Sequence, residues 1–545
     1  MELSEKNRPP IHDQRFQVIV IGGGINGVAI ARECARGGRR VLLLEQNDFA
    51  AGTTSRSTRI IHGGLRYLEH GEISLVRESL QERQRLLAHY PHLVRPMQFL
   101  LALGPTSKRS ALKVRLGLWL YRRFAGKSRS PLNIGDEGAR FESTLDSGGQ
   151  WSVFEYDDAQ CEFPERVVAE WLVEAADAGA TIRNHAQVLA IDVRHGRATG
   201  VLMRDLLTGK EERVEAAWII NATGPWADRM CQRSSIATHG PMLGGVRGSH
   251  VVLPCFPGAP KTAVFTEAVD GRPIFVIPWN HQILLGTTEV PDRDDPSRTI
   301  PSAAEVDYLL NSANTLFSRA NLSIEHVRYA FAGVRPLPFA QGRNPGKVTR
   351  RHFLHDHGKE GVQRLISVLG GKLTTAASLA RACARKIGIA VPEPRSVTVA
   401  QSTPETSLDD FIDEIAGLPG FSEHAAEQIA EWHGKRTLPI IQLARTNPDM
   451  RATLCPHTQH IVAEAADALV SEFAVTLADV LLRRVPVAFA ACWSDECSHI
   501  ASGRIAAAVG WDEKRRRAEL QAFEAEYHAF LRKPAELAVE EAAEP

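Results

Sequence analysis

The chain opens with a buried-strand pattern that runs directly into a glycine-rich loop. Residues 16–21 (FQVIVI) are apolar and β-branched, which is typical of a parallel strand covered on both faces. The glycine-rich stretch 22–27 follows, residues 28–36 repeat apolar positions at helical spacing, and 41–44 form a second apolar run that ends in Glu45. The order strand, glycine loop, helix, strand predicts a βαβ unit.

This unit has the residue types that a dinucleotide requires. Glycines without side chains let the backbone approach a pyrophosphate, whose charge the helix N-terminus stabilises. An acidic residue at the end of the second strand can accept hydrogen bonds from a ribose. We therefore predict that Gly22, Gly24, Gly27 and Glu45 hold the adenosine-diphosphate half of a dinucleotide, the alternative being a glycine-rich structural turn.

The later segments show helical and strand patterns in turn. A hydroxyl-rich connection occupies 52–59, a basic helical pattern 72–125, a helix and then strands 166–194, and a strand at 217–220 ends in NATGPW. Alternating positions at 248–254, 263–278 and 282–288 predict an antiparallel sheet. The apolar run 365–369 enters a second glycine pair and a helix, 391–395 is a proline-containing linker, and helical patterns dominate beyond 405.

Length and charge narrow the class of protein. The 545 residues suffice for two or three domains, and 64 basic against 64 acidic residues give no overall attraction to nucleic acid. The eight cysteines include no CxxC pair, which favours a reducing compartment over a disulfide scaffold. Residues 1–15 are polar and no apolar run of about 18 residues occurs, so we expect neither a secretory signal nor a membrane-spanning helix.

The layout favours a flavin over a nicotinamide cofactor. A second mononucleotide unit does not follow the first. Instead, the stretch 52–59 and a distant strand ending in Ala-Thr-Gly suit a long cofactor threaded through the protein. The sequence has no second GxGxxG, so no separate NAD(P)H site is expected. The predicted cofactor is FAD, with electrons arriving from a small substrate.

Six motifs in order along the chain resemble the aerobic FAD-dependent glycerol-3-phosphate dehydrogenase family. They are IHGGLRYLE at 61–69, GSH at 248–250, FVIPW at 275–279, LGTT at 285–288, GVRPL at 333–337 and GGKLTT at 370–375. The similarity covers about 16–385 and extends to 472–484 (EFAVTLADVLLRR), which is similar to the helical cap domain of that family.

The resemblance implies an α/β fold with three kinds of domain. These are an FAD-binding Rossmann-like domain of the glutathione-reductase type, an antiparallel β substrate domain and an all-α C-terminal domain. We expect the FAD-binding domain at 14–80, 151–246 and 331–390, the substrate-binding domain at 247–330 and the C-terminal helical domain at 400–530. A helical, basic segment at 81–150 is expected to face a membrane.

The resemblance also implies a reaction, the oxidation of sn-glycerol 3-phosphate to dihydroxyacetone phosphate, with hydride transfer to flavin N5 and electrons passed to a membrane quinone. Such chemistry needs a base for the hydroxyl proton and a cationic grip on the phosphate. His250 is our candidate base because the pKa of histidine lies near working pH, and Arg335 and Lys372 complete the predicted catalytic set. The substrate pocket implied by the resemblance comprises Arg66, Tyr67, His250, Arg335, Arg350 and Lys372.

The predicted cofactor contacts run from the first glycine loop to the last. Hydroxyl groups at 53–57 can donate to phosphate or ring atoms, and the turn at 371–374 offers backbone N–H groups at a helix start. The full set is Gly22, Gly24, Gly27, Glu45, Thr53, Thr54, Ser57, His62, Gly63, Gly64, Val188, Thr223, Gly224, Gly371, Lys372, Leu373 and Thr374. No metal site is predicted, because the His-rich HFLHDH at 352–357 fits exposed loop residues better.

Three departures from the family pattern bear on the reaction. Ala376 and Ala377 replace a Tyr-Arg pair, Glu289 replaces an aspartate, and 158–166 matches the family only loosely. The alternatives are a glycerol-3-phosphate oxidase that uses O₂, a flavoenzyme for a related phosphorylated alcohol or for an amine, and a non-catalytic flavin-binding regulatory protein. The phosphate-binding arginines argue against an amine.

A basic, aromatic segment at 107–129 suits a membrane surface. It has no acidic residue, and Leu, Trp and Phe are interleaved with Lys and Arg. The alternative is a helix that covers the FAD domain and turns its charges to water. We expect a cytoplasmic protein that is peripheral on the inner face of the cytoplasmic membrane, with quinone as electron acceptor and no nucleic-acid partner. The resemblance also implies a homodimer.

Overall fold

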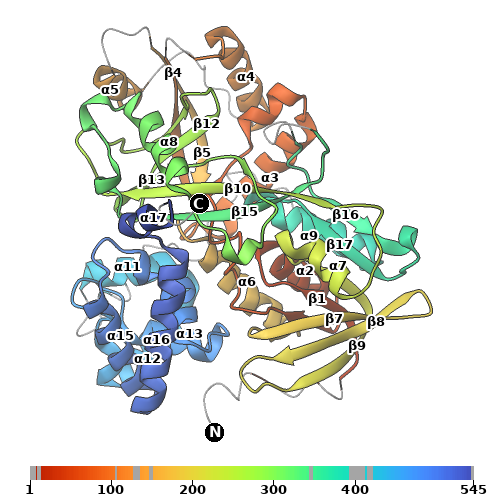
Figure 1. The fold of residues 1–545 in the computed structure, drawn as a ribbon. Helices are drawn as coiled ribbons and strands as arrows, with labels where there is room; N and C mark the ends of the chain where they lie inside the picture. Colours follow the sequence, from red (N-terminus) through yellow and green to blue (C-terminus); the bar gives the residue numbers. More distant parts are fainter. Residues whose placement is uncertain are drawn as a thin grey trace.

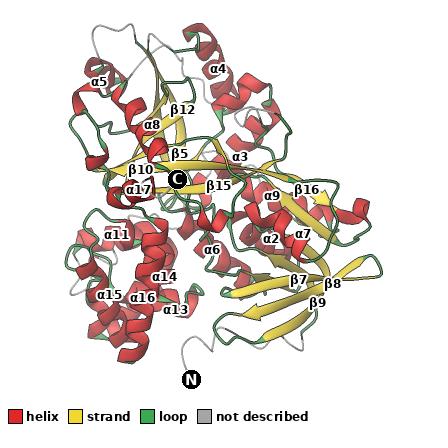
Figure 2. Ribbon diagram, viewed as in Figure 1, coloured by secondary structure: helices red, strands yellow, loops and turns green. Residues whose placement is uncertain are grey.

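The computed structural model describes residues 8, 11, 14–104, 107–126, 135–145, 151–342, 348–391, 412–413, 416 and 422–541. They form two β-sheets with covering helices and a separate group of C-terminal helices (Figures 1 and 2). The predicted linker at 391–395 lies outside the described residues except for Val391, as do 127–129 of the predicted membrane segment.

The first sheet contains the N-terminal βαβ unit. Its parallel strands are ordered β17 (Leu365–Leu369), β9 (Glu211–Asn221), β1 (Phe16–Ile21), β2 (Val41–Leu44) and β6 (Thr181–Arg183), with β16 (Phe353–Asp356) antiparallel at the edge. One face packs on α2 (Ile25–Arg36), α6 (Pro164–Asp177) and α9 (Ala376–Lys386). The other packs on α7 (Ala227–Arg233) and the hairpin of β7 (Ala186–Arg194) and β8 (Arg197–Asp205). The structure confirms the predicted strand, glycine loop, helix and strand.

The second sheet is antiparallel apart from one pair of strands. Its strands are β3 (Ile60–Ile61), β4 (Arg95–Leu103), β5 (Ser152–Gln160), β10 (Leu243–Leu253), β11 (Ala263–Glu267), β12 (Pro273–Trp279), β13 (Gln282–Gly286), β14 (Val290–Pro291) and β15 (Tyr329–Pro338). Their order is β14-β10-β13-β12-β11-β4-β5-β3, with β15 paired to β10 and β4 parallel to β11. The sheet therefore contains strands from well outside 247–330, the range predicted for the substrate-binding domain.

The expectation of helix throughout the 81–150 segment is wrong at β4. Leu100 and Ala102 point into one hydrophobic core, whereas Phe99, Leu101 and Leu103 point into another. A strand buried on both faces is a continuous apolar run, which periodicity cannot distinguish from a buried helix. The tertiary pairing with β5 and β11 decides the structure here.

In the part of the chain that the structure describes, four helices cover the second sheet. They are α3 (Ile73–His89), α4 (Ala111–Phe124), α5 (Asp136–Thr144) and α8 (Ala303–Asn314). α4 lies at the top of the molecule, at the opposite end from the C-terminal helices (Figure 1). No helix among the described residues is both long and apolar enough to cross a bilayer.

The C-terminal helices form the all-α part of the fold (Figure 2). They are α11 (Glu423–His433), α12 (Thr437–Thr446), α13 (Val462–Ser471), α14 (Leu477–Asp479), α15 (Asp495–Val509), α16 (Glu513–Phe530) and α17 (Pro534–Glu541). Their core also contains Val252, Leu284 and Phe331 from the second sheet. The helical group is therefore packed against the sheet that carries His250.

Candidate active site

Close backbone contacts shape the glycine-rich loop after β1. Gly22 has φ +107°, and a Cβ on Gly27 would lie 1.8 Å from the carbonyl oxygen of Gly22, so a side chain fits at neither position. The N–H of Ile25 donates to Thr54 Oγ1 at 3.0 Å, which holds the 52–59 connection against the start of α2. The loop presents the positive end of the α2 dipole to an adjoining cavity, where an anion is stabilised.

That cavity has a volume of about 660 Å³ and is lined by residues from both sheets. All of the predicted cofactor residues line it except Gly27 and Gly63. Gly27 instead packs against Gly22, and the N–H of Gly63 donates to Tyr121 Oη at 2.8 Å. All six predicted substrate residues line the same cavity.

Glu45 closes one end of the glycine loop. Its Oε2 accepts from the N–H of Gly23 at 2.6 Å, and its Oε1 accepts from the N–H of Asn47 at 2.9 Å. Burial raises the pKa of this carboxyl, and the two backbone donors oppose that shift. Its place at the end of β2 suits an acceptor for ribose hydroxyls.

A second set of predicted residues meets where the 370–375 turn contacts the 61–67 segment. The N–H of His62 donates to Thr374 Oγ1 at 3.2 Å. Lys372 Nζ donates to Ser79 Oγ at 2.8 Å and lies 4.4 Å from the centroid of the Tyr67 ring. Burial lowers the pKa of Lys372 to about 7 and the pKa of His62 to about 3. The lysine therefore changes charge near neutral pH, whereas His62 stays neutral.

Three arginines converge on one carboxylate at the cavity wall. Glu289 Oε1 lies 2.7 Å from Arg350 Nη2, 3.5 Å from Arg335 Nη1 and 3.6 Å from Arg66 Nη1. Arg335 Nη2 also donates to Thr287 Oγ1 at 2.9 Å. Burial lowers the pKa of Arg335 to about 10, which leaves it charged at neutral pH. Three positive charges around one negative charge provide a site for a further anion.

His250 lies on β10 beside this cluster. Its Nε2 is 2.9 Å from Thr58 Oγ1, and its ring stacks on Phe331 with 5.0 Å between centroids. Burial lowers the pKa of His250 to about 3, and the nearby Arg335 and Arg59 add to the shift. The imidazole is therefore neutral at physiological pH, and its pKa lies well below the value near working pH on which its selection as the candidate base rested.

Five buried polar atoms of residues that line the cavity have no hydrogen-bond partner among the described residues. They are Asn26 Oδ1, Arg56 Nε, Arg59 Nε, His250 Nδ1 and Arg350 Nη1. Buried polar groups are ordinarily paired, so these atoms indicate a polar ligand. Together with the side-chain-free glycine loop, they fit a dinucleotide with a pyrophosphate and a second, anionic molecule beside it.

Some predicted residues have other roles in the structure. Thr54 Oγ1 accepts a hydrogen bond from the N–H of Ile25, and Thr53 Oγ1 donates to the carbonyl of Val334 at 2.7 Å. The expectation that HFLHDH is exposed is wrong for His357, which is buried and lies 2.8 Å from Ser367 Oγ through Nε2. His357 begins the short helical turn His357–Glu360 after β16, and its side chain lies against Ser367 of β17 and Cys231 of α7, which its polar sequence does not reveal.

The sequence prediction omits other residues of the cavity wall, among them Asn26, Thr58 and Glu289. Asn26 lies within the glycine loop, so its position was a usable signal, and its Nδ2 donates to the carbonyl of Gly370 at 3.3 Å. Thr58 and Glu289 reach the site only because β10 and its neighbours bring His250 and the arginines to them.

Comparison with known proteins points in one direction. The family described as FAD dependent oxidoreductase matches residues 17–384, and the C-terminal domain of alpha-glycerophosphate oxidase matches residues 362–516. A glycerol-3-phosphate dehydrogenase of Synechocystis is 36% identical over 89% of this chain and 91% of its own length. The aerobic glycerol-3-phosphate dehydrogenase of Escherichia coli is 34% identical over 79% of this chain and 86% of its own. A D-erythritol 1-phosphate dehydrogenase of Brucella abortus is 37% identical over 67% of this chain and 72% of its own.

A solved structure shares the whole fold. The glycerol-3-phosphate dehydrogenase of Bacillus halodurans complexed with FAD superposes with a TM-score of 0.76 over 97% of this chain and 98% of that one, at 23% identity. The overall architecture, including the helical C-terminal part, is thus one already seen with FAD bound.

Proposed function

Because the chain belongs to the FAD-dependent oxidoreductases, and within them to the aerobic glycerol-3-phosphate dehydrogenase family, we propose that it oxidises sn-glycerol 3-phosphate to dihydroxyacetone phosphate. The observation that carries the substrate assignment is the cluster of Arg66, Arg335 and Arg350 in the same cavity as the glycine-rich loop. Guanidinium groups bind a phosphate through paired, charge-assisted hydrogen bonds. A small substrate held there reaches His250 and Lys372 on the same wall.

FAD, when bound, supplies the two-electron acceptor, and we propose its N5 as the atom that receives the hydride. The chain itself holds the substrate and moves its proton. The arginines fix the phosphate, which orients the alcohol carbon. His250, with its proton on Nε2 and donated to Thr58 Oγ1, keeps Nδ1 free to accept the hydroxyl proton. Lys372, where charged, stabilises negative charge that develops on the substrate oxygen.

We further propose a membrane quinone as the final electron acceptor and a peripheral position on the inner face of the cytoplasmic membrane. α4 supports this proposal, because its outward face exposes Leu112, Leu116 and Trp119 by 74%, 65% and 54%. Basic residues, among them Lys113 and Arg115, flank these side chains and complement an anionic headgroup layer. The homodimer implied by the family resemblance stays a prediction.

A second candidate substrate is a longer phosphorylated polyol. The D-erythritol 1-phosphate dehydrogenase is as similar to this chain as the glycerol-3-phosphate enzymes are, over a shorter stretch. The arginine cluster recognises a phosphate and does not by itself define the length of the carbon chain. Chain length must therefore be tested directly.

The test is anaerobic reduction of the purified, FAD-containing protein, followed by the visible absorbance of the flavin. We expect sn-glycerol 3-phosphate to bleach the flavin band rapidly and glycerol, which lacks the phosphate, to leave it unchanged. D-erythritol 1-phosphate serves as the competing substrate, and faster bleaching with it would assign the polyol activity instead. A flavin that stays oxidised with both phosphates would refute the proposal. Reoxidation of the bleached protein by a soluble quinone or by O₂ then identifies the acceptor.

A matched pair of variants tests the phosphate site separately from the cofactor site. Arg335→Ala should lower kcat/KM for sn-glycerol 3-phosphate by about 30-fold or more, since removing one partner of a charged contact costs about 2–5 kcal/mol. Flavin content should stay at the wild-type level. Arg213→Ala, which removes an exposed guanidinium, is the control and should change neither quantity.

A further inference from the structure

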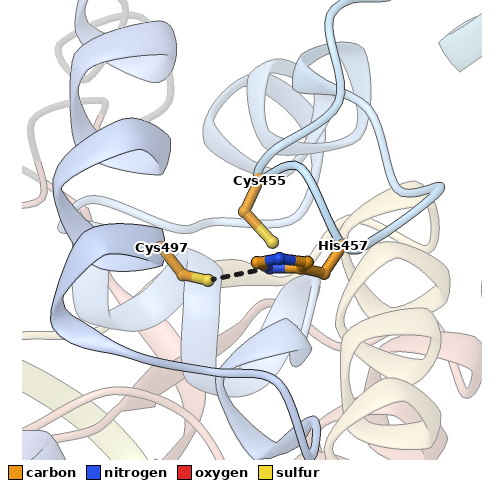
Figure 3. Close-up of side chains that lie close together, drawn as sticks. All are labelled: Cys455, His457 and Cys497. Carbon is orange, nitrogen blue, oxygen red and sulfur yellow. Dashed lines mark hydrogen bonds between the residues drawn. The ribbon is translucent and has the colours of Figure 1, made fainter.

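Three metal-ligating side chains meet in the C-terminal helical part, outside the cavity described above (Figure 3). Cys455 and His457 lie in the loop before α13, and Cys497 lies in the first turn of α15. One ligand atom from each lies within 4.8 Å of the other two. Cys497 Sγ is 3.8 Å from His457 Nδ1 (Figure 3). The two cysteines are buried and the histidine is exposed, so the histidine lies on the solvent side of the group.

The surrounding backbone holds these side chains in place. The N–H of Leu454 donates to the carbonyl of His460 at 2.7 Å, and Thr453 forms a β-bridge with Ile461, which closes the 455–460 loop. Ser494 caps α15, because its Oγ accepts from the N–H of Cys497 at 3.3 Å and donates to Cys497 Sγ at 3.5 Å. Donors at a helix N-terminus favour a thiolate, which is the form that binds metals.

A fourth candidate ligand lies next to these three. Cys492 is partly buried and its carbonyl accepts from Cys497 Sγ at 3.5 Å, whereas its thiol lies outside the group of ligand atoms within 4.8 Å of one another and would have to move closer to bind the ion. With Cys492 as the fourth ligand, the set would be three thiols and one imidazole, in the spacing C-x-H followed by C-x₄-C. This composition is that of a closed structural zinc site.

We propose that Cys455, His457, Cys492 and Cys497 bind a structural Zn²⁺ ion. Tetrahedral coordination with Zn–S of about 2.3 Å and Zn–N of about 2.0 Å separates sulfur and nitrogen ligands by about 3.5 Å. The observed 3.8 Å between Cys497 Sγ and His457 Nδ1 needs only a small closure. Thiolate ligands exclude Mg²⁺ and Ca²⁺, and a Cys₃His set with neighbouring backbone support favours Zn²⁺ among the softer ions.

The ion would tie the C-terminal helices to the segment that contacts the second sheet. That segment comprises residues 489–492. The carbonyl of Phe489 accepts from Gln282 Nε2 at 2.9 Å and from Tyr329 Oη at 3.2 Å. The carbonyl of Ala491 accepts from Arg328 Nη1 at 2.6 Å. Zinc bound at Cys492 would therefore join the 455–460 loop and the start of α15 to residues 489–492. It would take no part in the oxidation of the substrate.

The experiment uses the full-length, FAD-containing protein purified with a reducing agent and without a chelator. Metal content is measured by mass spectrometry, and we expect about one zinc ion per chain. After removal of zinc with a chelator, Co²⁺ should produce tetrahedral d–d bands and a thiolate-to-cobalt charge-transfer band. Added Zn²⁺ should displace the Co²⁺ and abolish these bands. This reconstitution does not depend on any variant that folds poorly.

Matched variants locate the site. Cys455→Ser, His457→Ala and Cys497→Ser should lower the zinc content, with the two cysteine variants below about a tenth of an ion per chain. Cys255→Ser, at an exposed cysteine, and His499→Ala, at an exposed histidine on the same helix, should keep it. Flavin absorbance reports that each variant is folded.

Two results would overturn the proposal. One is a wild-type protein that carries no zinc as purified and takes up neither Zn²⁺ nor Co²⁺ after reduction. The other is a disulfide between two of these cysteines in protein isolated under thiol-blocking conditions, detected as a mass lower by two hydrogens. That result would assign the cluster to thiol chemistry instead of metal binding.

Discussion

Glu289 determines how much positive charge the phosphate-binding end of the cavity carries. Its carboxylate lies within 3.6 Å of Arg66, Arg335 and Arg350, and it holds them together while no substrate is bound. A substrate phosphate must share these arginines with the carboxylate. The residue at position 289 therefore sets both the arrangement of the arginines and the net charge that an incoming anion meets.

Neutralising Glu289 should strengthen anion binding. In Glu289→Gln, inorganic phosphate and sn-glycerol 3-phosphate should bind about fivefold more tightly at low salt, because a repulsion of at least about 1 kcal/mol is removed. The measurement is competitive inhibition by phosphate at two ionic strengths. Glu289→Asp, which keeps the charge, is the control. Equal inhibition constants for wild type and Glu289→Gln would contradict the charge argument.

Lys372 should impose a pH dependence on substrate capture. Burial lowers its pKa to about 7, so the ammonium is charged below pH 7 and is lost as the pH rises. We expect kcat/KM for the anionic substrate to fall as the pH increases through about 7 to 9, because a favourable charge disappears. Lys372→Arg stays charged over this range and should remove that fall. Parallel profiles for the two proteins would exclude Lys372 as the titrating group.

Among the individual elements, α4 has apolar positions on more than one face because one apolar stripe is buried and another is exposed. Val114, Leu118 and Tyr121 point into the core under the second sheet. Leu112 and Trp119 belong to the opposite, exposed stripe. A helix with a buried apolar face and an exposed apolar face among basic side chains is suited to lie between a protein core and a headgroup layer.

Removing the exposed stripe should weaken membrane binding without affecting chemistry. The double variant Leu116→Ser, Trp119→Ser should lower binding to vesicles that contain anionic phospholipid by at least tenfold, since each large apolar side chain contributes about 1.5–3 kcal/mol on burial. Turnover with a soluble electron acceptor should stay unchanged. Leu438→Ser, at an exposed apolar position on α12, is the control. Co-sedimentation with vesicles measures the effect, and equal binding of all three proteins would argue against α4.

At the scale of the whole molecule, buried ion pairs join the C-terminal helices to the FAD-binding sheet. Asp48, which follows β2, accepts from Arg484 Nη2 at 2.9 Å and from Arg483 Nε at 2.5 Å. Arg166 on α6 donates to both carboxylate oxygens of Glu472 at 2.6 and 2.8 Å. A buried charge that loses its partner lowers the free energy of unfolding. The two parts therefore depend on each other for stability.

Breaking the Asp48 contacts should loosen this connection. Asp48→Ala leaves the buried Arg484 without its paired carboxylate and removes one of the three carboxylates around Arg483, which destabilises the protein by about 3–5 kcal/mol. The expected observations are a lower midpoint of thermal unfolding and faster proteolysis between the FAD-binding part and the C-terminal helices. Glu211→Gln breaks the exposed pair with Arg204 and should cost about 1 kcal/mol or less. An unchanged midpoint in Asp48→Ala would show that the Asp48 ion pairs do not contribute to holding the two parts together.

Local patterns along the chain were sufficient to predict the dinucleotide-binding half of this protein. The strand, glycine loop and helix at 16–36 and the turn at 370–375 are local patterns, and local patterns carry their own physical constraints, such as the side-chain-free contact of Gly27 with Gly22. The arginines and His250 were reached through family resemblance. The structure brings all of them to one cavity.

Features that depend on long-range pairing become evident in the folded molecule and not in any local pattern. β4 is a strand because β5 and β11 flank it, although its apolar run fits a buried helix equally well. Glu289 joins the arginines, and Cys455 lies beside Cys497, because segments far apart in the chain fold together. No periodicity or spacing encodes such neighbours. Their proximity arises from sheet register and helix packing, which the chain specifies only as a whole.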